Sequence, residues 1–420
     1  MIAPARVAAF TVIRRVFEHG AYTDRALHAA AAGLEPRDRS LAMALAYGAV
    51  QRRATLDHVT ARLSDRPVDE LDPPVLATLR LGLLQLLFMD GIAEHAAVND
   101  SVELVKGGGG AGLVNAVLRR ATREGRALIE GLSDAEPGNA AVKYSVPVWL
   151  AELWFAELGA GRARSLLAVV NDPAESALRV NTLVAAPAEV LAALPVRAHA
   201  ARGLPEALVL EEPFDAFGSE LFRRGAIMPQ SRASMHVSRA LAPEPGERVL
   251  DLCAAPGAKT THLAALVGDT GSVRAVEVNP QRADGLARTA ARMHATRVEI
   301  EVADASAVAP GGLYDRVLVD PPCSGLGTLQ SRPDLRWRTS PERVSELSAL
   351  QGRVLAAGAG ATRPGGRLVY SVCTISRAES EQVIEPFLDA HAGWQLESAE
   401  QLAPDRDGTD GFWIARLRRL

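Results

Sequence analysis

Residues 249–259 read VLDLCAAPGAK, and this stretch decides how the C-terminal part of the chain folds. A short apolar run ends in Asp251, small residues and Pro256-Gly257 break it, and a helical pattern resumes through Val267. A strand, a glycine turn and a helix in this order form the opening unit of a nucleotide-type sheet. Its ligand lies against the turn and the N-terminus of the helix.

Regular alternation of apolar runs with helical patterns begins at Glu247. Helical stretches between most of the runs indicate βαβ units, so we predict a doubly wound α/β sheet. Ser340-Pro341 is typical of a helix N-cap, and Ser376 with Glu379 predicts a capping box. The apolar runs are residues 249–252, 273–278, 298–302, 317–319 and 368–372.

The first turn resembles two known phosphate-binding loops without matching either. A P-loop would require glycine in place of Leu252, and the dinucleotide pattern GxGxxG is absent. An adenosine ligand without a polyphosphate remains open. Glu277 ends the second run and suits ribose hydroxyls, and Asp304 follows the third run and suits an adenine edge. Either acid could instead be an N-cap or surface residue, but with Asp251 and Gly257 they fit S-adenosylmethionine.

The cysteines are Cys253, Cys323 and Cys373. Their odd number argues against a disulfide framework, and their spacing does not suggest zinc, so we predict no metal site. Each cysteine follows an apolar run, which in a parallel sheet places it at the carboxyl edge. A single buried cysteine is more often inert packing. Two cysteines on adjacent strand-end loops, beside Asp320, favour a catalytic role.

Size and composition indicate a folded, multidomain protein. The chain has 420 residues, 48% of them hydrophobic and 23% charged. The sequence contains no run of the roughly 18 apolar residues that a membrane span needs. Arg14 and Arg15 interrupt the apolar N-terminus, so we expect a helix and not a signal peptide. We expect a cytoplasmic monomer. The net charge of −4 does not indicate a nucleic-acid partner, although it can hide a local basic face.

Three domains are expected along the chain: an all-α domain at 1–130, a small α/β subdomain at 145–240, and the Rossmann-like α/β domain at 241–420. In the first, 75–88 suits a buried helix introduced by Pro73-Pro74. A helix at 113–126 carries arginines on one broad face, which is either a solvated face or a stripe that contacts phosphates. These arginines are Arg119, Arg120, Arg123 and Arg126.

Three motifs closely resemble signatures of the Nol/Nop/Sun RNA 5-methylcytosine methyltransferases: DLCAAPGAKT, DPPCSGLGT and YSVCTIS. The segments LRLGLLQLLF, EHAAVNDSVELVK and GLVNAVLRR resemble the NusB-like RNA-binding domain of the branch that acts on 16S ribosomal RNA. The sequence RVNTL and the terminal Asp410-Gly411-Phe412 match as well. The resemblance therefore covers nearly the whole chain.

The resemblance implies transfer of a methyl group from S-adenosylmethionine to C5 of a cytosine in small-subunit rRNA. It assigns the nucleophile to Cys373, resolution of the covalent adduct to Cys323, and orientation of the cytosine to Asp320. Such a nucleophile is chemically necessary because cytosine C5 reacts poorly until a thiolate adds to C6. The implied cofactor residues are Cys253, Ala254, Ala255, Pro256, Gly257, Ala258, Lys259, Glu277, Asp304 and Asp320. Cys253 then belongs to the cofactor turn and is not a nucleophile.

The target base must leave its stack, so a cytosine in a loop or single strand is expected. Residues shortly after Cys323 are candidates for gripping this RNA, or else form a solvated loop packed by one tryptophan. They are Arg332, Arg336, Trp337 and Arg338. Two positions depart from the family pattern: Ala258 replaces a glycine and Glu277 replaces an aspartate.

Two alternatives remain. The same chemistry could act on another RNA, such as tRNA. The chain could also be a non-catalytic RNA-binding or antitermination-type factor with a relic methyltransferase domain. Retention of both cysteines, Asp320 and the whole glycine turn argues against the second alternative.

Overall fold

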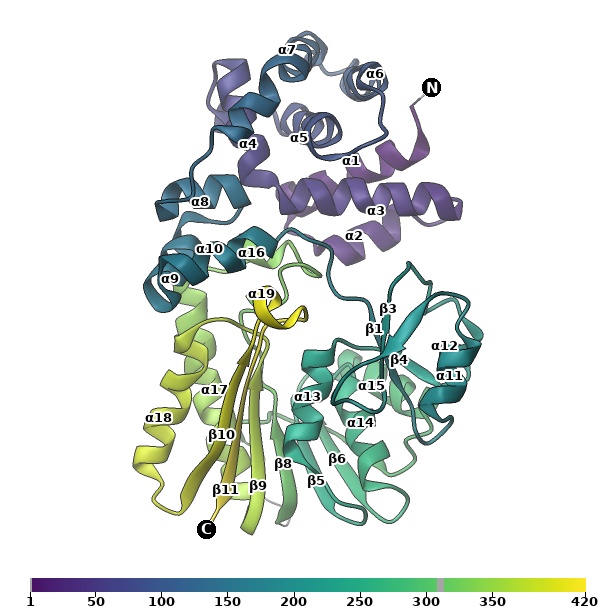
Figure 1. Cartoon of the computed structure of the whole chain (residues 1–420), viewed down its shortest axis with the longest axis vertical. Coiled ribbons are helices and arrows are strands. Elements are labelled where there is room, and N and C mark those ends of the chain that lie inside the picture. Colours follow the sequence, from purple (N-terminus) through teal and green to yellow (C-terminus); the bar gives the residue numbers. More distant parts are fainter. Residues whose placement is uncertain (1, 308–312) are drawn as a thin grey trace. The chain divides into compact units, whose positions relative to one another are not determined.

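The computed structural model describes residues 2–307 and 313–420. The chain divides into two compact units, coloured by sequence in Figure 1. The helical unit comprises Met1–Asp172 together with Leu329–Thr339, and the sheet unit comprises Pro173–Thr328 and Ser340–Leu420. The segment Leu329–Thr339 therefore belongs to the helical unit although its neighbours in sequence belong to the sheet unit.

Much of the helical unit packs around a large apolar core, in which Leu45, Leu79 and Leu118 are fully buried. Helix α5, Pro73–Phe88, starts at Pro73-Pro74 as predicted and is buried on most of its surface. Helix α7, Ala111–Glu130, buries only the stripe that contains Val114 and Leu118. The other elements are α1 (Pro4–His19), α2 (Thr23–Ala30), α3 (Pro36–Gln51), α4 (Arg53–Ser64), η1 (Val68–Glu70), α6 (Glu94–Leu104), α8 (Pro137–Tyr144), α9 (Val148–Leu158), α10 (Ala160–Val169) and α16 (Leu335–Arg338).

The sheet unit begins with a small antiparallel sheet of order β2-β3-β1-β4. Its strands are β1 (Ala177–Val180), β2 (Ala198–Ala200), β3 (Ala207–Leu210) and β4 (Ile227–Pro229), accompanied by α11 (Pro187–Ala193) and α12 (Glu220–Arg223). Buried residues such as Leu178, Val190 and Ile227 join the sheet to its helices. The predicted small α/β subdomain is thus present.

The large sheet has the order β10-β11-β9-β8-β5-β6-β7. Strands β7, β6, β5, β8 and β9 are parallel, while β11 and β10 are antiparallel to their neighbours. The strands are β5 (Arg248–Leu252), β6 (Ser272–Glu277), β7 (Val298–Val302), β8 (Tyr314–Val319), β9 (Thr362–Val372), β10 (Trp394–Leu402) and β11 (Phe412–Arg419). The predicted doubly wound sheet is confirmed, with an antiparallel edge that the sequence patterns did not predict.

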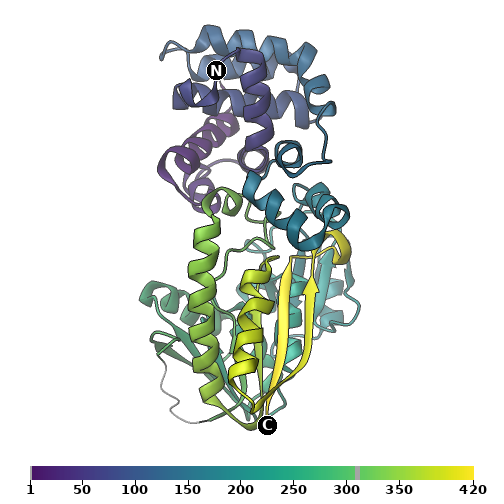
Figure 2. The ribbon, with the colours of Figure 1, turned by 90° about the vertical axis from the view of Figure 1, so that its left-hand side faces the viewer.

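Helices cover both faces of the large sheet. One face packs on α17 and α18, which lie in front of the strands in Figure 2, and the other packs on α13, α14 and α15. The N-cap at Ser340 is confirmed, since its hydroxyl accepts from Arg343 N. The helices are α13 (Arg232–Leu241), α14 (Ala258–Val267), α15 (Pro280–Arg292), α17 (Pro341–Ala361), η2 (Arg377–Glu379), α18 (Glu381–Ala390) and α19 (Pro404–Asp407).

The predicted capping box of Ser376 and Glu379 is wrong. The Ser376 side chain makes no capping hydrogen bond, and α18 begins only at Glu381. The Glu379 side chain is fully buried and turns toward the strand ends instead. Hydrogen bonds to buried polar groups therefore determine the position of the Glu379 side chain, and it does not cap the helix.

None of the helices in the described part of the chain combines the length and apolar character needed to cross a membrane.

Candidate active site

The chemistry-bearing motifs meet at the carboxyl edge of the large sheet. Strands β5, β8 and β9 are direct neighbours, and they end just before Cys253, Asp320 and Cys373 respectively. Because these strands are parallel, their following turns lie at one edge, as the sequence predicted. The adjacent strands β6 and β7 end at Glu277 and just before Asp304, which extends the same edge.

The turn after β5 has a backbone that only certain residues adopt easily. Gly257 has φ +101°, and a Cβ there would lie 2.7 Å from Leu286 Cδ1. Cys253 also has a positive φ, of 67°. Ala258 is not among the positive-φ residues, so its methyl group is tolerated where the family pattern has glycine. The small residues of the turn let a ligand approach the backbone closely.

The buried carboxylate of Asp251 in β5 stabilises this turn. Asp251 is 1% exposed and accepts a hydrogen bond of 2.7 Å from Thr260 Oγ1 in the first turn of α14. Burial raises the pKa of Asp251 to about 7, partly offset by the Thr260 hydrogen bond. Asp251 therefore joins the strand end to the helix that follows the turn.

The two acids expected to meet adenosine differ in their surroundings. Glu277 is buried, accepts from Asn279 N at 2.9 Å, and lies 3.5 Å from an Arg282 guanidinium nitrogen. Asp304 is exposed and accepts from the backbone N and the hydroxyl of Ser306. These hydrogen bonds lower the pKa of Asp304. Glu277 is thus held rigidly, whereas Asp304 caps a local turn and keeps its carboxylate in solvent.

Asp320 is held between two neighbouring motifs. Its Oδ2 lies 2.7 Å from Lys259 Nζ, and its Oδ1 accepts a hydrogen bond of 2.7 Å from Ser371 Oγ. Burial alone would lower the pKa of Lys259, but the charge and hydrogen bond of Asp320 raise it overall. The ammonium of Lys259 thus stays charged, and Asp320 is fixed in one orientation beside the cysteines. Sequence reasoning assigned Lys259 to the cofactor alone and did not find Ser371.

Cys323 and Cys373 face each other with their sulfur atoms 3.2 Å apart. Their contact, burial, and the negative charges of Glu379 and Asp320 raise the pKa of the Cys323 thiol well above its usual value. Burial, together with nearby carboxylates, raises the pKa of Cys253 to about 12. A thiol that stays protonated suits the prediction that Cys253 is not a nucleophile. The structure thus places Cys323 and Cys373 together as one pair.

Gly327 and Gly411 hold the loops of Cys323 and Cys373 close to the start of β11. Gly327 N donates to Cys373 O at 3.0 Å, and Gly411 N donates to Gly327 O at 2.7 Å. A Cβ on Gly327 would lie 1.9 Å from Gly411 O. The Asp410-Gly411-Phe412 motif therefore acts through close backbone contact, which side-chain patterns in the sequence could not reveal.

Arg179 of the RVNTL sequence supports α14 from the small sheet. Its buried guanidinium donates to Ala258 O and, at 2.8 Å, to Thr261 Oγ1. Burial lowers the pKa of Arg179 to about 9. The neighbouring Asn181 donates to Met293 O and Gly225 O. Arg179 thus fixes α14, and Asn181 binds the end of α15, two contacts that the sequence did not predict.

The RNA contact predicted for Arg336 is corrected by the structure, and the neighbouring Trp337 is partly buried. Arg336 is fully buried in the helical unit and donates to the backbone oxygens of Gln51, Ser145, Val170 and Leu329. The indole N–H of Trp337 donates to Val50 O at 2.7 Å, and its ring packs against the helical core. Both side chains anchor Leu329–Thr339, and the fully buried Arg336 is not available to grip RNA. Arg338 donates to Gly20 O, while Arg332 is exposed.

On α7, the arginine stripe is partly used within the protein. Arg120 pairs with Asp65 at 3.1 Å and Glu124 at 3.2 Å. Arg119, Arg123 and Arg126 are exposed, opposite the buried stripe of the same helix. The exposed arginines thus lie on the face of α7 that is turned away from the core.

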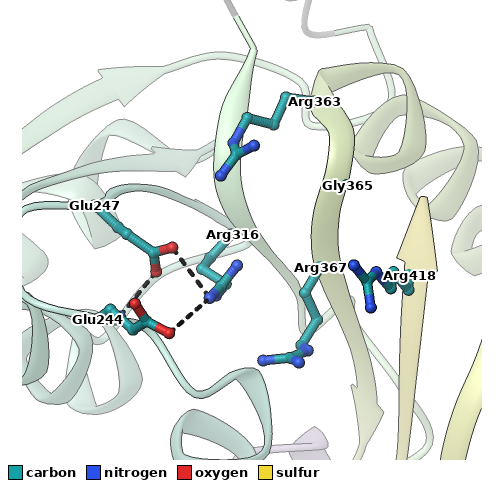
Figure 3. Close-up of a pocket in the computed structure, with 7 residues that line it drawn as sticks. All are labelled: Glu244, Glu247, Arg316, Arg363, Gly365, Arg367 and Arg418. Atoms are coloured by element: carbon teal, nitrogen blue, oxygen red, sulfur yellow. Dashed lines mark hydrogen bonds and ion pairs between the residues drawn. The ribbon is translucent and has the colours of Figure 1, made fainter. Parts of the chain in front are cut away.

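A cavity of about 260 Å³ lies near the opposite ends of the strands (Figure 3). Arg316, Arg367 and Arg418 are direct neighbours across β8, β9 and β11. Side-by-side cations repel. Glu247 lies 3.0 Å from Arg316, and Glu397 lies 3.0 Å from Arg367, so carboxylates offset this repulsion. We interpret the charged residues that line this cavity as a structural ion-pair network. No group of three or more potential metal ligands occurs among residues 2–307 and 313–420.

Comparison with known proteins identifies the family. Residues 238–418 match the 16S rRNA methyltransferase RsmB/F family, 3–123 the NusB family, and 146–216 the ferredoxin-like domain of RsmF/B-like methyltransferases. A probable ribosomal RNA small subunit methyltransferase B from Synechocystis is 37% identical over 99% of both chains. The chain belongs to the RsmB/F methyltransferase family.

Other relatives agree with this family. The ribosomal RNA small subunit methyltransferase B of Thermus thermophilus is 37% identical, over 91% of this chain and 89% of the relative. The crystal structure of PH0851 superposes with a TM-score of 0.81 at 29% identity, covering 100% of this chain and 99% of that one.

S-adenosylmethionine is the cofactor of this methyltransferase family, as the sequence predicted. The residues present fit it. The small-residue turn after β5 admits close approach of a ligand, and Glu277 and Asp304 stand at the next two strand ends.

Proposed function

We propose that this protein transfers a methyl group from S-adenosylmethionine to C5 of a cytosine in small-subunit rRNA. The observation that carries the proposal is the 3.2 Å pair of Cys323 and Cys373 beside Asp320. The ribosomal substrate is supported by the NusB match and by the names of the full-length relatives.

The cofactor supplies an electrophilic methyl group. Within the chain, Cys373 adds through its sulfur to C6 of the cytosine, which makes C5 enamine-like and nucleophilic. Asp320, fixed by Lys259 and Ser371, holds the base around N3. After methylation, loss of the C5 proton expels the Cys373 sulfur. Cys323, the neighbouring thiol, assists this release.

The RNA is bound in part by α7. Exposed Arg119, Arg123 and Arg126 are placed to contact backbone phosphates, whereas Arg120 is engaged in ion pairs. The cytosine must be unstacked to reach the thiols, so we propose that it lies in a loop or single strand.

The test uses unmodified small-subunit rRNA, labelled S-adenosylmethionine, and wild type, Cys373→Ala and Cys323→Ala proteins. Cys373→Ala should transfer no methyl group and form no adduct. Cys323→Ala should accumulate a protein–RNA complex that survives denaturant. Full activity of Cys373→Ala would overturn the assignment of the nucleophile.

Matched tRNA reactions separate the substrate from the chemistry. Wild-type transfer to tRNA but not to rRNA would keep the thiol mechanism and reject the ribosomal assignment. Absence of both transfer and cofactor binding would favour a non-catalytic RNA-binding factor.

A further inference from the structure

The buried carboxylate of Glu379 connects the two cysteine loops. Ser324 follows Cys323 and Thr374 follows Cys373 in sequence, and both hydroxyls reach the same oxygen of Glu379. The Thr374 contact is 3.1 Å, and the two hydroxyls lie 2.8 Å from each other. One side chain thus contacts the residue next to each thiol.

The other Glu379 oxygen fixes this side chain from the opposite direction. Oε1 accepts from Ser324 N at 2.8 Å and from Gln351 Nε2 at 2.9 Å. Gln351 lies on α17, and its other amide atom accepts from Tyr370 OH on β9 at 3.1 Å. Glu379 is 0% exposed, so these partners replace the water that its carboxylate would otherwise need.

We propose that Glu379 is a positioning residue that sets the separation and protonation of the Cys323–Cys373 pair. It holds both cysteine loops through Ser324 and Thr374, and its charge faces the pair from inside the fold. This inference rests on the proposed function for its catalytic consequence, but its effect on the thiols does not depend on that function.

Other charges also face the pair. Asp320 lies on the β8 side, and Lys259 Nζ of α14 lies 2.7 Å from its Oδ2. The contact with Cys373 and burial are the main causes that raise the pKa of Cys323. The negative charges of Glu379 and Asp320 raise this pKa further. Removing the Glu379 charge should therefore move deprotonation of Cys323 to lower pH.

The test compares Glu379→Gln with wild type and with Glu381→Gln. Glutamine has the shape of glutamate, but an NH2 group replaces one of the two carboxylate oxygens. This NH2 group is a donor and cannot accept a hydrogen bond from Ser324 or Thr374. Glu381 lies at the start of α18 and makes its hydrogen bond with Ser380, so it is a matched control.

The first readout is the pH dependence of alkylation of each cysteine, followed by mass spectrometry without RNA or cofactor. Cys323 and Cys373 are partly exposed residues, so the alkylating reagent should be small. We expect the Cys323 midpoint to fall in Glu379→Gln and to stay at the wild-type value in Glu381→Gln. An unchanged midpoint would overturn the proposal, whatever reaction the protein catalyses.

The second readout is steady-state methyl transfer. Misplacing the thiols should lower kcat about 10- to 100-fold in Glu379→Gln, with KM for cofactor and RNA unchanged. A wild-type kcat would contradict the proposal. If Glu379→Gln does not fold, Thr374→Val removes the link on the Cys373 side alone and should give a smaller fall in kcat. No fall would refute the positioning role.

Discussion

Gly327→Ala tests whether close backbone packing positions the cysteine loops. The new Cβ would lie 1.9 Å from Gly411 O and 2.6 Å from Gly411 C, distances that no real Cβ contact reaches. The obstructing atoms are backbone, so rotation of a side chain cannot relieve the overlap. The two segments must separate by about 1 Å or more.

The separation breaks identifiable hydrogen bonds. Gly411 N to Gly327 O, now 2.7 Å, lengthens beyond hydrogen-bond range, and Gly327 N to Cys373 O is disturbed. Loss of buried hydrogen bonds costs about 1–3 kcal/mol each, so we expect a destabilisation of about 2–4 kcal/mol. A displacement of about 1 Å at a reacting group can reduce the rate about 100-fold, so kcat should fall by this order.

The assay combines urea unfolding with single-turnover methylation at saturating cofactor. Gly352→Ala is the matched control, because it lies inside α17 and its Cβ would meet nothing within 4 Å. That substitution should stabilise by about 0.5–1 kcal/mol and leave kcat unchanged. Wild-type stability and rate in Gly327→Ala would refute the packing argument.

Further predictions concern buried polar groups. Arg336→Met should destabilise the protein by about 3 kcal/mol in thermal unfolding, because several backbone oxygens lose their hydrogen-bond donor. Wild-type stability of this variant would contradict the anchoring role of Arg336. Arg179→Gln should weaken cofactor binding about 10-fold by calorimetry, because α14 loses its support at Ala258. The folded-state pKa of Asp251 is raised from 3.8 to about 7, so the stability contributed by its protonated form is lost as pH rises through this range. Asp251→Asn should therefore gain stability relative to wild type between pH 4 and 8 in urea unfolding, and a constant difference would exclude the linkage.

The sequence predicted the elements whose causes are local. Apolar runs and turn residues located β5 through β9, and parallel pairing then placed Cys323 and Cys373 at one edge. The N-cap at Ser340 was equally predictable from the sequence, because a cap depends on residues only three positions apart. The family resemblance supplied residue roles that patterns alone could not provide.

The rest depends on contacts between residues far apart in sequence. Glu379 was assigned to a local cap, but its partners Ser324 and Gln351 come from other elements. Arg336 looked like an exposed RNA contact, because charged residues are seldom fully buried. Its backbone partners in the helical unit lie up to 285 positions away. Strand β10 was missed, since a polar edge strand lacks a clear apolar run. Strand β11 lies inside the sheet between β10 and β9, and its short apolar start at 412–415 was not recognised as a strand.

The most direct measurement of the central claim is the chemical identity of the trapped complex. Cys323→Ala protein would be incubated with small-subunit rRNA and S-adenosylmethionine, denatured, digested with protease and nuclease, and analysed by mass spectrometry. We predict a peptide whose Cys373 carries one methylated cytidine. A cytidine on another residue, or complete methylation by a protein that never forms a covalent complex, would contradict the proposed thiol mechanism.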